Sequence, residues 1–308
     1  MNSNLLADSP RPTVAAPALR TKAELRSVLA DARRNDQTIG LVPTMGYLHQ
    51  GHLSLIRAAR AECDLVVMSL FVNPTQFGEG EDLDRYPRDE ERDLRLAGEA
   101  GADLVFAPAV EEVYPEGPDG CVTRVEVTGS FTGVLDGDRT RRGPEHFRGV
   151  TTVVAKLFNI VGPDVAYFGQ KDAQQAVVIR RMARDLDFPV RIEVLPTVRE
   201  PDGLAMSSRN AYLGPEDRER ATALSRALAA AERGARADSL GVGLEAARRE
   251  LAAAGIEPEY LEARDAETLE PVHALADRPV LVAVAAPVGP ARLIDNVLIQ
   301  PNEPHTNT

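Results

Sequence analysis

The sequence predicts an α/β protein, with a parallel sheet in a larger first domain and an α+β arrangement in a smaller second one. From residue 21 to about residue 195, short apolar segments alternate with segments whose apolar residues recur at helical spacing. The segment 65–72 is apolar at nearly every position, which is typical of a strand covered on both faces. This alternation indicates βαβ units joined by right-handed crossovers.

The elements of the first domain, assigned to residues 21–197, follow from this spacing. Thr21 suits a helix N-cap, and Leu53, Ile56 and Ala59 share one helical face. In chain order we expect helices at 21–32, from about 51, at 151–161 and at 173–186, and strands at 39–42, 65–72, 104–107, 165–168 and 190–195.

The second domain is assigned to residues 198–300. We expect Ala- and Arg-rich helices at 215–236 and 240–254, followed by short strands at 259–263, 280–284 and 293–298. Residues 1–20 contain three prolines and no continuous apolar stretch, so we interpret them as a flexible extension and not as a secretory signal. The polar residues 301–308 predict a disordered tail.

Composition excludes several classes of protein. The 308 residues carry a net charge of -12, which argues against non-specific binding to nucleic acid or to anionic membranes. No apolar run approaches the roughly 20 residues of a membrane span. Cys63 and Cys121 belong to no CxxC or Cys/His cluster, so we expect neither a disulfide framework nor a structural zinc site. A cytoplasmic location is the simplest interpretation.

The segment 43–52, Pro-Thr-Met-Gly-Tyr-Leu-His-Gln-Gly-His, is the most informative one. It follows a buried strand and opens a helix, so it lies at the carboxyl edge of the sheet, where ligands bind. The free N–H groups of a helix N-terminus suit phosphates, and His49 and His52 can project toward the same phosphate chain. The alternatives are two capping histidines or a metal pair, but no third ligand follows at a familiar spacing. The His-x-Gly-His pattern resembles the signature of the nucleotidyltransferase superfamily.

Three further segments carry suitable side chains. In 200–210, Ser207, Ser208 and Arg209 can close over a triphosphate, although an isolated Ser-Ser-Arg is more often an N-cap beside a solvated arginine. This loop is similar to the Lys-Met-Ser-Lys-Ser loop of the same superfamily. In 169–175, Lys171 can neutralise phosphate charge. Asp172, which alone would be an N-cap, can also bind ribose or Mg²⁺. The segment 71–77 supplies neutral amides for a small polar acid.

These motifs occur together and in order, from about residue 20 to about residue 299. With Asp-Arg-Tyr-Pro-Arg at 84–88 and Ala-Arg-Leu-Ile-Asp-Asn at 291–296, they resemble the pantothenate synthetase family. The resemblance implies a Rossmann-like nucleotidyltransferase domain, and pantoate, β-alanine and ATP with Mg²⁺ as ligands, in a homodimer. It implies ATP contacts for Met45, Gly46, Tyr47, Leu48, His49, Gln50, Gly51, His52, Gly169, Gln170, Lys171, Asp172, Val198, Met206, Ser207, Ser208 and Arg209.

The same resemblance implies individual roles. His52 stands where the family has its catalytic proton donor, and His49, Lys171 and Arg209 are the other catalytic candidates. The resemblance implies that Gln76 and Gln175 bind pantoate and that Gln76 also contacts β-alanine. It further implies that Asp93 helps to place Mg²⁺. Asn73 is a further candidate for holding the acid, from its amide alone. The histidines, lysine and arginine would form a cationic surround for the adenylation of a carboxylate.

One region departs from the family pattern. The family carries Arg-Pro-x-His-Phe-x-Gly-Val, whereas Gly143 here stands three places before His146, where the arginine is expected. Arg142 or Arg141 could replace it, and the sequence leaves this choice open. Two rival functions also stay open: another adenylate-forming or nucleotide-transferring enzyme, and a nucleotide-binding regulatory protein without catalysis.

Overall fold

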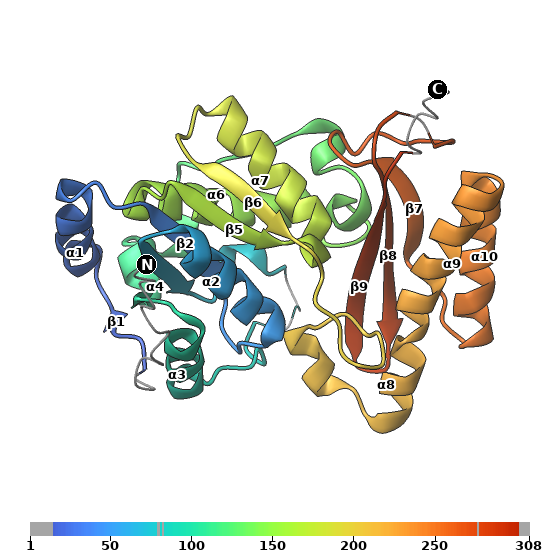
Figure 1. The fold of residues 1–308 in the computed structure, drawn as a ribbon, viewed down its shortest axis with the longest axis horizontal. Helices are drawn as coiled ribbons and strands as arrows, with labels where there is room; N and C mark the ends of the chain where they lie inside the picture. The colour runs from blue at the N-terminus through green and yellow to red at the C-terminus, as the bar shows by residue number, and fades with distance from the viewer. Residues whose placement is uncertain (1–14, 79–80, 82, 276, 302–308) are drawn as a thin grey trace, which may run out of the picture.

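The computed structural model describes residues 15–78, 81, 83–275 and 277–301, and these residues form two domains (Figure 1). The first contains a six-stranded parallel sheet with the order β1-β4-β3-β2-β5-β6. Its strands are β1 (Ala18–Leu19), β2 (Ile39–Thr44), β3 (Leu65–Leu70), β4 (Leu104–Phe106), β5 (Val165–Gly169) and β6 (Arg191–Leu195). The strand order reverses between β2 and β5, so the loops after these two strands diverge and leave a crevice at the carboxyl edge.

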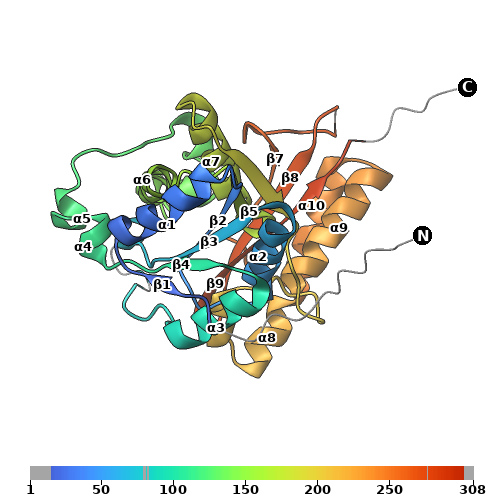
Figure 2. The ribbon, with the colours of Figure 1, turned by 60° about the vertical axis from the view of Figure 1, so that its left-hand side comes forward.

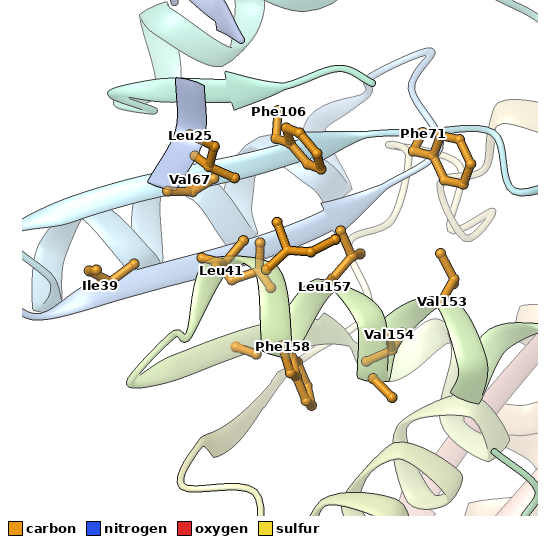
Figure 3. Packing of buried hydrophobic residues seen from close by; sticks show 14 of the residues in the cluster. Leu25, Ile39, Leu41, Val67, Phe71, Phe106, Val153, Val154, Leu157 and Phe158 are labelled. Carbon is orange, nitrogen blue, oxygen red and sulfur yellow. The ribbon is translucent and has the colours of Figure 1, made fainter. Parts of the chain in front are cut away.

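Helices cover both faces of this sheet (Figure 2). They are α1 (Lys22–Arg34), α6 (Pro144–Val161) and α7 (Ala173–Asp185) on one face, and α2 (Gln50–Glu62) and α3 (Glu90–Ala100) on the other. Side chains alternate along each strand: Ile39 and Leu41 pack with α1 and α6, whereas Val42 packs with α2. Figure 3 shows Phe158 and Leu157 of α6 against the first of these faces.

The second domain is an antiparallel three-stranded sheet packed on helices. Its strands are β7 (Tyr260–Asp265), β8 (Val280–Val288) and β9 (Ala291–Ile299), and its helices are α8 (Pro215–Ala221), α9 (Ala223–Ala237) and α10 (Leu240–Ala253). The other face of this sheet meets the first domain, where Leu135 and Val177 join Tyr260 and Leu281 in one apolar cluster. The two domains therefore share a buried junction beside the crevice.

The fold class agrees with the prediction, but several details differ. The extension predicted for residues 1–20 is wrong at its end, because Ala18–Leu19 pairs with β4 and Ala16 is buried. Helix α3 was not predicted. The helix expected at 215–236 is interrupted at Thr222, and α6 begins seven residues earlier than expected. The tail 302–308 and residues 1–14 lie outside the described residues. Within the described part of the chain, no helix is both long enough and apolar enough to cross a membrane.

Five 3-10 segments and two four-residue helices make up the remaining helical elements of the described residues. The four-residue helices are α4 (Val110–Val113) and α5 (Gly117–Gly120). The 3-10 segments are η1 (Pro74–Gln76), η2 (Gly129–Phe131), η3 (Leu135–Gly137), η4 (Gln170–Asp172) and η5 (Ser208–Tyr212). Segments η1, η4 and η5 carry residues that the sequence analysis singled out, and all three lie at the crevice.

Candidate active site

A cavity of about 710 Å³ opens at the carboxyl edge of the large sheet, between the two domains. It is lined by the turns after β2, β3 and β5, by α6, by the segment 196–210 and by β9. Segments more than 200 positions apart in the chain thus meet in one place. The volume is within the usual range for a pocket that holds a small-molecule substrate.

A buried carboxylate holds the turn after β2 in place. Asp93 in α3 accepts hydrogen bonds from the backbone N–H groups of Tyr47 and Leu48, each at 2.7 Å. Tyr47 has a φ of +51° and Gly46 one of +90°. A side chain at Gly46 would lie 2.6 Å from Leu70 Cδ1, so this position requires glycine. Asp93 is 1% exposed and does not line the cavity.

The two histidines form a reciprocal cap at the start of α2. His49 Nδ1 accepts from the N–H of Gly51 at 3.2 Å, and His52 Nδ1 accepts from the N–H of His49 at 3.3 Å. Each Nδ1 is therefore an acceptor, so the proton of each neutral ring is on Nε2. The ring centroids are 4.1 Å apart, and both rings line the cavity.

Burial is the main cause that lowers the pKa of both rings. It brings the pKa of His49 to about 4 and, with the nearby charges of His49 and Lys171, holds the pKa of His52 well below its usual value. Without a nucleotide both rings are neutral Nε2–H donors at pH 7. In this state the fixed positive charge therefore belongs to the lysine and arginine side chains. The rings also accept hydrogen bonds from the N–H groups of His49 and Gly51, so these two groups at the helix N-terminus are not free to bind phosphate.

Lys171 and Asp172 follow β5 on the opposite side of the crevice. Their side chains form an ion pair at 3.5 Å, and Asp172 is half exposed. Asn296 of β9 donates from Nδ2 to the carbonyl oxygens of Gln170 and Lys171, each at 2.9 Å. Gln170 is itself bound to Asn296 Oδ1 and does not line the cavity. The second domain therefore holds the loop that presents Lys171.

The segment 198–206 is a small hairpin rather than an open loop. Arg199 bridges to Ala205, and Met206 donates its N–H to the carbonyl of Val198 at 3.0 Å. Ser207 caps η5 by accepting from the N–H of Arg209 at 3.3 Å, as the capping alternative predicted. Ser207 and Arg209 also line the cavity, so capping and ligand contact are compatible here.

Gln76 lies on η1 at the end of the crevice near α6. Asn73 Nδ2 donates to Gln76 Oε1 at 3.2 Å and to the carbonyl of Gly149 at 3.2 Å. Asn73 Oδ1 accepts from Thr75 and from Tyr114. Asn73 is 1% exposed, and its amide groups are occupied by protein atoms. Its polar capacity thus serves to orient Gln76 rather than to contact a substrate directly.

Gln174 and Gln175 both line the cavity, but the two side chains have different partners. The amide of Gln174 is bound to the backbone of Phe131, Val134 and Asp136. Among the predicted site residues, those lining the cavity are Met45, His49, Gly51, His52, Asn73, Gln76, Gly169, Lys171, Asp172, Gln175, Val198, Met206, Ser207, Ser208 and Arg209. Those outside it are Gly46, Tyr47, Leu48, Gln50, Asp93 and Gln170.

Several cavity residues were not predicted to take part. Glu81, Asp136, His146 and Arg292 all line it. Asp136 accepts from Arg292 at 2.8 Å, and this ion pair, together with the hydrogen bond from Tyr260 at 2.9 Å, lowers the pKa of the buried carboxyl despite the cost of burial. Arg292 belongs to the motif at 291–296, but no spacing along the sequence links it to Asp136, because the two residues are 156 positions apart.

The fold and the cavity together indicate the class of protein. The cavity lies at the edge of a doubly wound parallel sheet and contains two histidine donors, a lysine and a Ser-Ser-Arg segment. These features are typical of a nucleotide-binding enzyme that carries out phosphate chemistry. Among the described residues, no group of three or more His, Cys, Asp or Glu side chains is placed to hold a metal ion. The metal-pair alternative for the histidines therefore finds no further ligand in that part of the chain.

Comparison with known proteins identifies the family. The family model described as pantoate-beta-alanine ligase matches residues 17–298. A pantothenate synthetase of Moorella thermoacetica is 56% identical over 293 residues, which cover 92% of this chain and 99% of that protein. The chain belongs to the pantoate–β-alanine ligase family.

Solved structures agree. The pantothenate synthetase of Thermus thermophilus is 50% identical with a TM-score of 0.85, covering 92% of this chain and all of that one. The pantoate-beta-alanine ligase of Francisella tularensis, solved with beta-gamma ATP and beta-alanine, is 33% identical with a TM-score of 0.76. That match covers 92% of this chain and 98% of the other.

Proposed function

We propose that this chain is a pantothenate synthetase, which joins (R)-pantoate to β-alanine through a pantoyl-adenylate and releases AMP and pyrophosphate. The observation that carries the proposal is the single cavity in which the phosphate-binding side chains face the Gln76 and Gln175 amides. Phosphate-binding groups alone would suit any nucleotide enzyme. The two amides add a neutral site for a small hydroxy acid beside them, and membership of the family identifies that acid as pantoate.

In the first step a pantoate carboxylate oxygen attacks the α-phosphorus of ATP, and the bond to the β-phosphate oxygen breaks. The barrier comes from bringing two anions together and from the charge that develops on the leaving pyrophosphate. Lys171 and Arg209 supply fixed positive charge, and His49 and His52 supply Nε2–H donors. A bound triphosphate raises the pKa of such rings, so His52 can pass a proton to the leaving group.

In the second step the β-alanine amine attacks the acyl carbonyl, the bond between that carbon and the AMP oxygen breaks, and the nitrogen loses a proton. Water has to be kept away from the mixed anhydride in the interval. Ser208 is well placed for this, because it is buried and its hydroxyl lies 3.4 Å from the carbonyl oxygen of Tyr47. This contact joins the segment 206–209 to the histidine turn over the cavity.

Mg²⁺ is proposed to enter with ATP rather than to reside in the protein. Both Asp93 carboxylate oxygens already accept backbone hydrogen bonds, and the residue lies outside the cavity. These residues do not fit a protein-held Mg²⁺ site, so we route no step through one. Asp172 is the half-exposed carboxylate of the Lys171 turn, and its oxygens could reach a Mg²⁺ ion carried by the phosphates of ATP.

We further propose a cytoplasmic homodimer. Both cysteines are free thiols, which agrees with a reducing compartment. The homodimer is what the resemblance to the family implies. Light scattering at micromolar concentration measures the mass directly, and a mass of one chain would rule the dimer out.

The test is an assay with purified protein, ATP, Mg²⁺, pantoate and β-alanine. AMP and pyrophosphate should form only when pantoate is present. AMP release that does not depend on pantoate would contradict the proposal. His52→Ala should lower the adenylation rate by about 100-fold or more, as expected for loss of a proton donor. His273→Ala is the matched control, because that histidine is exposed in the second domain. Equal rates for both variants would move the proton-donor role elsewhere.

A further inference from the structure

Four residues form a continuous chain of contacts along the α6 side of the cavity. Glu81 and Arg142 are paired through two hydrogen bonds, Nε to Oε1 at 3.0 Å and Nη2 to Oε2 at 2.9 Å. Arg142 Nη1 lies 3.2 Å from His146 Nε2. His146 Nδ1 lies 2.6 Å from the backbone oxygen of Gln76. All four residues line the cavity, and His146 is only 8% exposed.

The partners at the two ring nitrogens of His146 determine its tautomer. A carbonyl oxygen can only accept, so Nδ1 must carry the proton that it donates to Gln76. A guanidinium can only donate, so Nε2 must be the acceptor for Arg142. Both contacts require the same neutral ring. The low pKa of His146, about 4, agrees, and its causes are burial and then the charge of Arg142.

Gln76 is thereby fixed from two sides. His146 holds its backbone carbonyl, and Asn73 holds its side-chain oxygen. Its Nε2 also contacts Met45 Sδ at 3.0 Å. These contacts use one N–H and one lone pair of the amide, and the remaining N–H and lone pair are available to a ligand in the cavity.

We propose that Arg142 is a positioning residue for the proposed pantoate site: together with Glu81 it holds His146 in the tautomer that anchors Gln76. The proposal rests on the proposed function, since it assigns Gln76 to pantoate. Arg141 cannot take this part, because its guanidinium lies 4.6 Å from the centroid of the Tyr260 ring and binds the Leu135 carbonyl at 2.8 Å.

The backbone explains why the arginine is at 142 and not at 143. Gly143 has a φ of +80° and precedes Pro144 at the start of α6. An arginine at 143 would be strained in this conformation. The guanidinium therefore comes from the preceding residue, whose Nη1 still reaches His146 across the first turn of the helix.

The experiment compares pantoate and ATP kinetics of Arg142→Gln with those of Arg139→Gln. Arg139 is exposed in the same segment, so its variant removes the same charge without touching the chain of contacts. For Arg142→Gln we expect the KM for pantoate to rise about tenfold and the KM for ATP to change less than about twofold, as for loss of one well-placed hydrogen bond. Arg139→Gln should match the unmodified protein.

A second readout separates positioning from simple loss of structure. Removing Arg142 leaves Glu81 and Asp136 facing His146, and both raise its pKa. The KM for pantoate of Arg142→Gln should then rise as pH falls from 7 to 5.5, whereas that of the unmodified protein should not. Glu81→Gln should shift the pantoate KM in the same direction, and less than additively with Arg142→Gln.

The outcomes are distinct. If the unmodified protein forms no AMP in response to pantoate, the proposed function fails. If it is active and Arg142→Gln matches Arg139→Gln, or if the KM values for pantoate and ATP rise equally, the positioning role is overturned. If Arg142→Gln does not fold, Glu81→Gln carries the test, and an unchanged pantoate KM in that variant overturns the proposal.

Discussion

Gly149→Ala should destabilise the protein, although alanine is the better helix former. Gly149 lies inside α6, where the substitution alone would add about 1 kcal/mol of helix stability. However, a Cβ there would lie 2.2 Å from the carbonyl oxygen of Thr75 and 2.8 Å from Gln76 Cα. Both are backbone atoms of η1, so no side-chain rotation relieves the overlap.

The size of the effect follows from these two opposing contributions. The nearest atom has to move by about 1 Å, which for overpacking against backbone costs about 3 kcal/mol, at the upper end of the usual range. After the gain in helix propensity, the free energy of unfolding should fall by about 2 kcal/mol. Because η1 carries Gln76, the KM for pantoate should also rise more than that for ATP.

The assay is urea unfolding followed by circular dichroism, with steady-state kinetics on the same preparation. Gly241→Ala is the matched control, because Gly241 is an exposed glycine near the start of α10 with no atom closer than 4.0 Å to the added Cβ. That variant should gain about 0.5 kcal/mol. A Gly149→Ala protein as stable as the unmodified one would refute the reasoning.

The remaining predictions concern two buried groups. Asp93→Ala leaves the N–H groups of Tyr47 and Leu48 without their acceptor, so the free energy of unfolding should fall by about 2–4 kcal/mol in urea titrations. The Mg²⁺ concentration for half-maximal activity should stay unchanged in this variant. An increase would support the role in placing Mg²⁺ that the family resemblance implies for Asp93. Burial lowers the pKa of His146 to about 4, so its stabilising contribution is complete above pH 6.5 and is lost as pH falls toward 4. Between pH 6.5 and pH 4 the free energy of unfolding of the unmodified protein should fall by about 3 kcal/mol more than that of His146→Phe. Equal decreases in the two proteins would contradict this prediction.

The sequence predicts the main features of the fold because its local patterns and its tertiary structure agree. The apolar segments at 39–44, 65–70 and 165–169 are all strands of the sheet, and each is followed by the motif expected at its carboxyl end. Since parallel strands end at one edge, the turns carrying His52, Gln76 and Lys171 had to meet. Helix α3 was missed although Asp89 is an N-cap and the first turn is acidic, both of which favour the start of a helix.

The local patterns thus predict the fold class, the strand-to-helix turns and the types of side chain at the edge of the sheet. The contacts of each side chain depend on the folded arrangement. Gln174 and Gln175 are equivalent as letters and both line the cavity, yet the amide of Gln174 is bound to the protein backbone. Arg142 lines the cavity and contacts His146, whereas Arg141 does not line it and binds the Leu135 carbonyl.

The physical reason is that hydrogen-bond partners of buried groups come from distant parts of the chain. Asp93 binds residues more than 40 positions away, and His146 binds a carbonyl 70 positions away. Spacing along the sequence carries no information about such contacts. They form only when the sheet brings its loops together and burial makes an unpaired polar group costly.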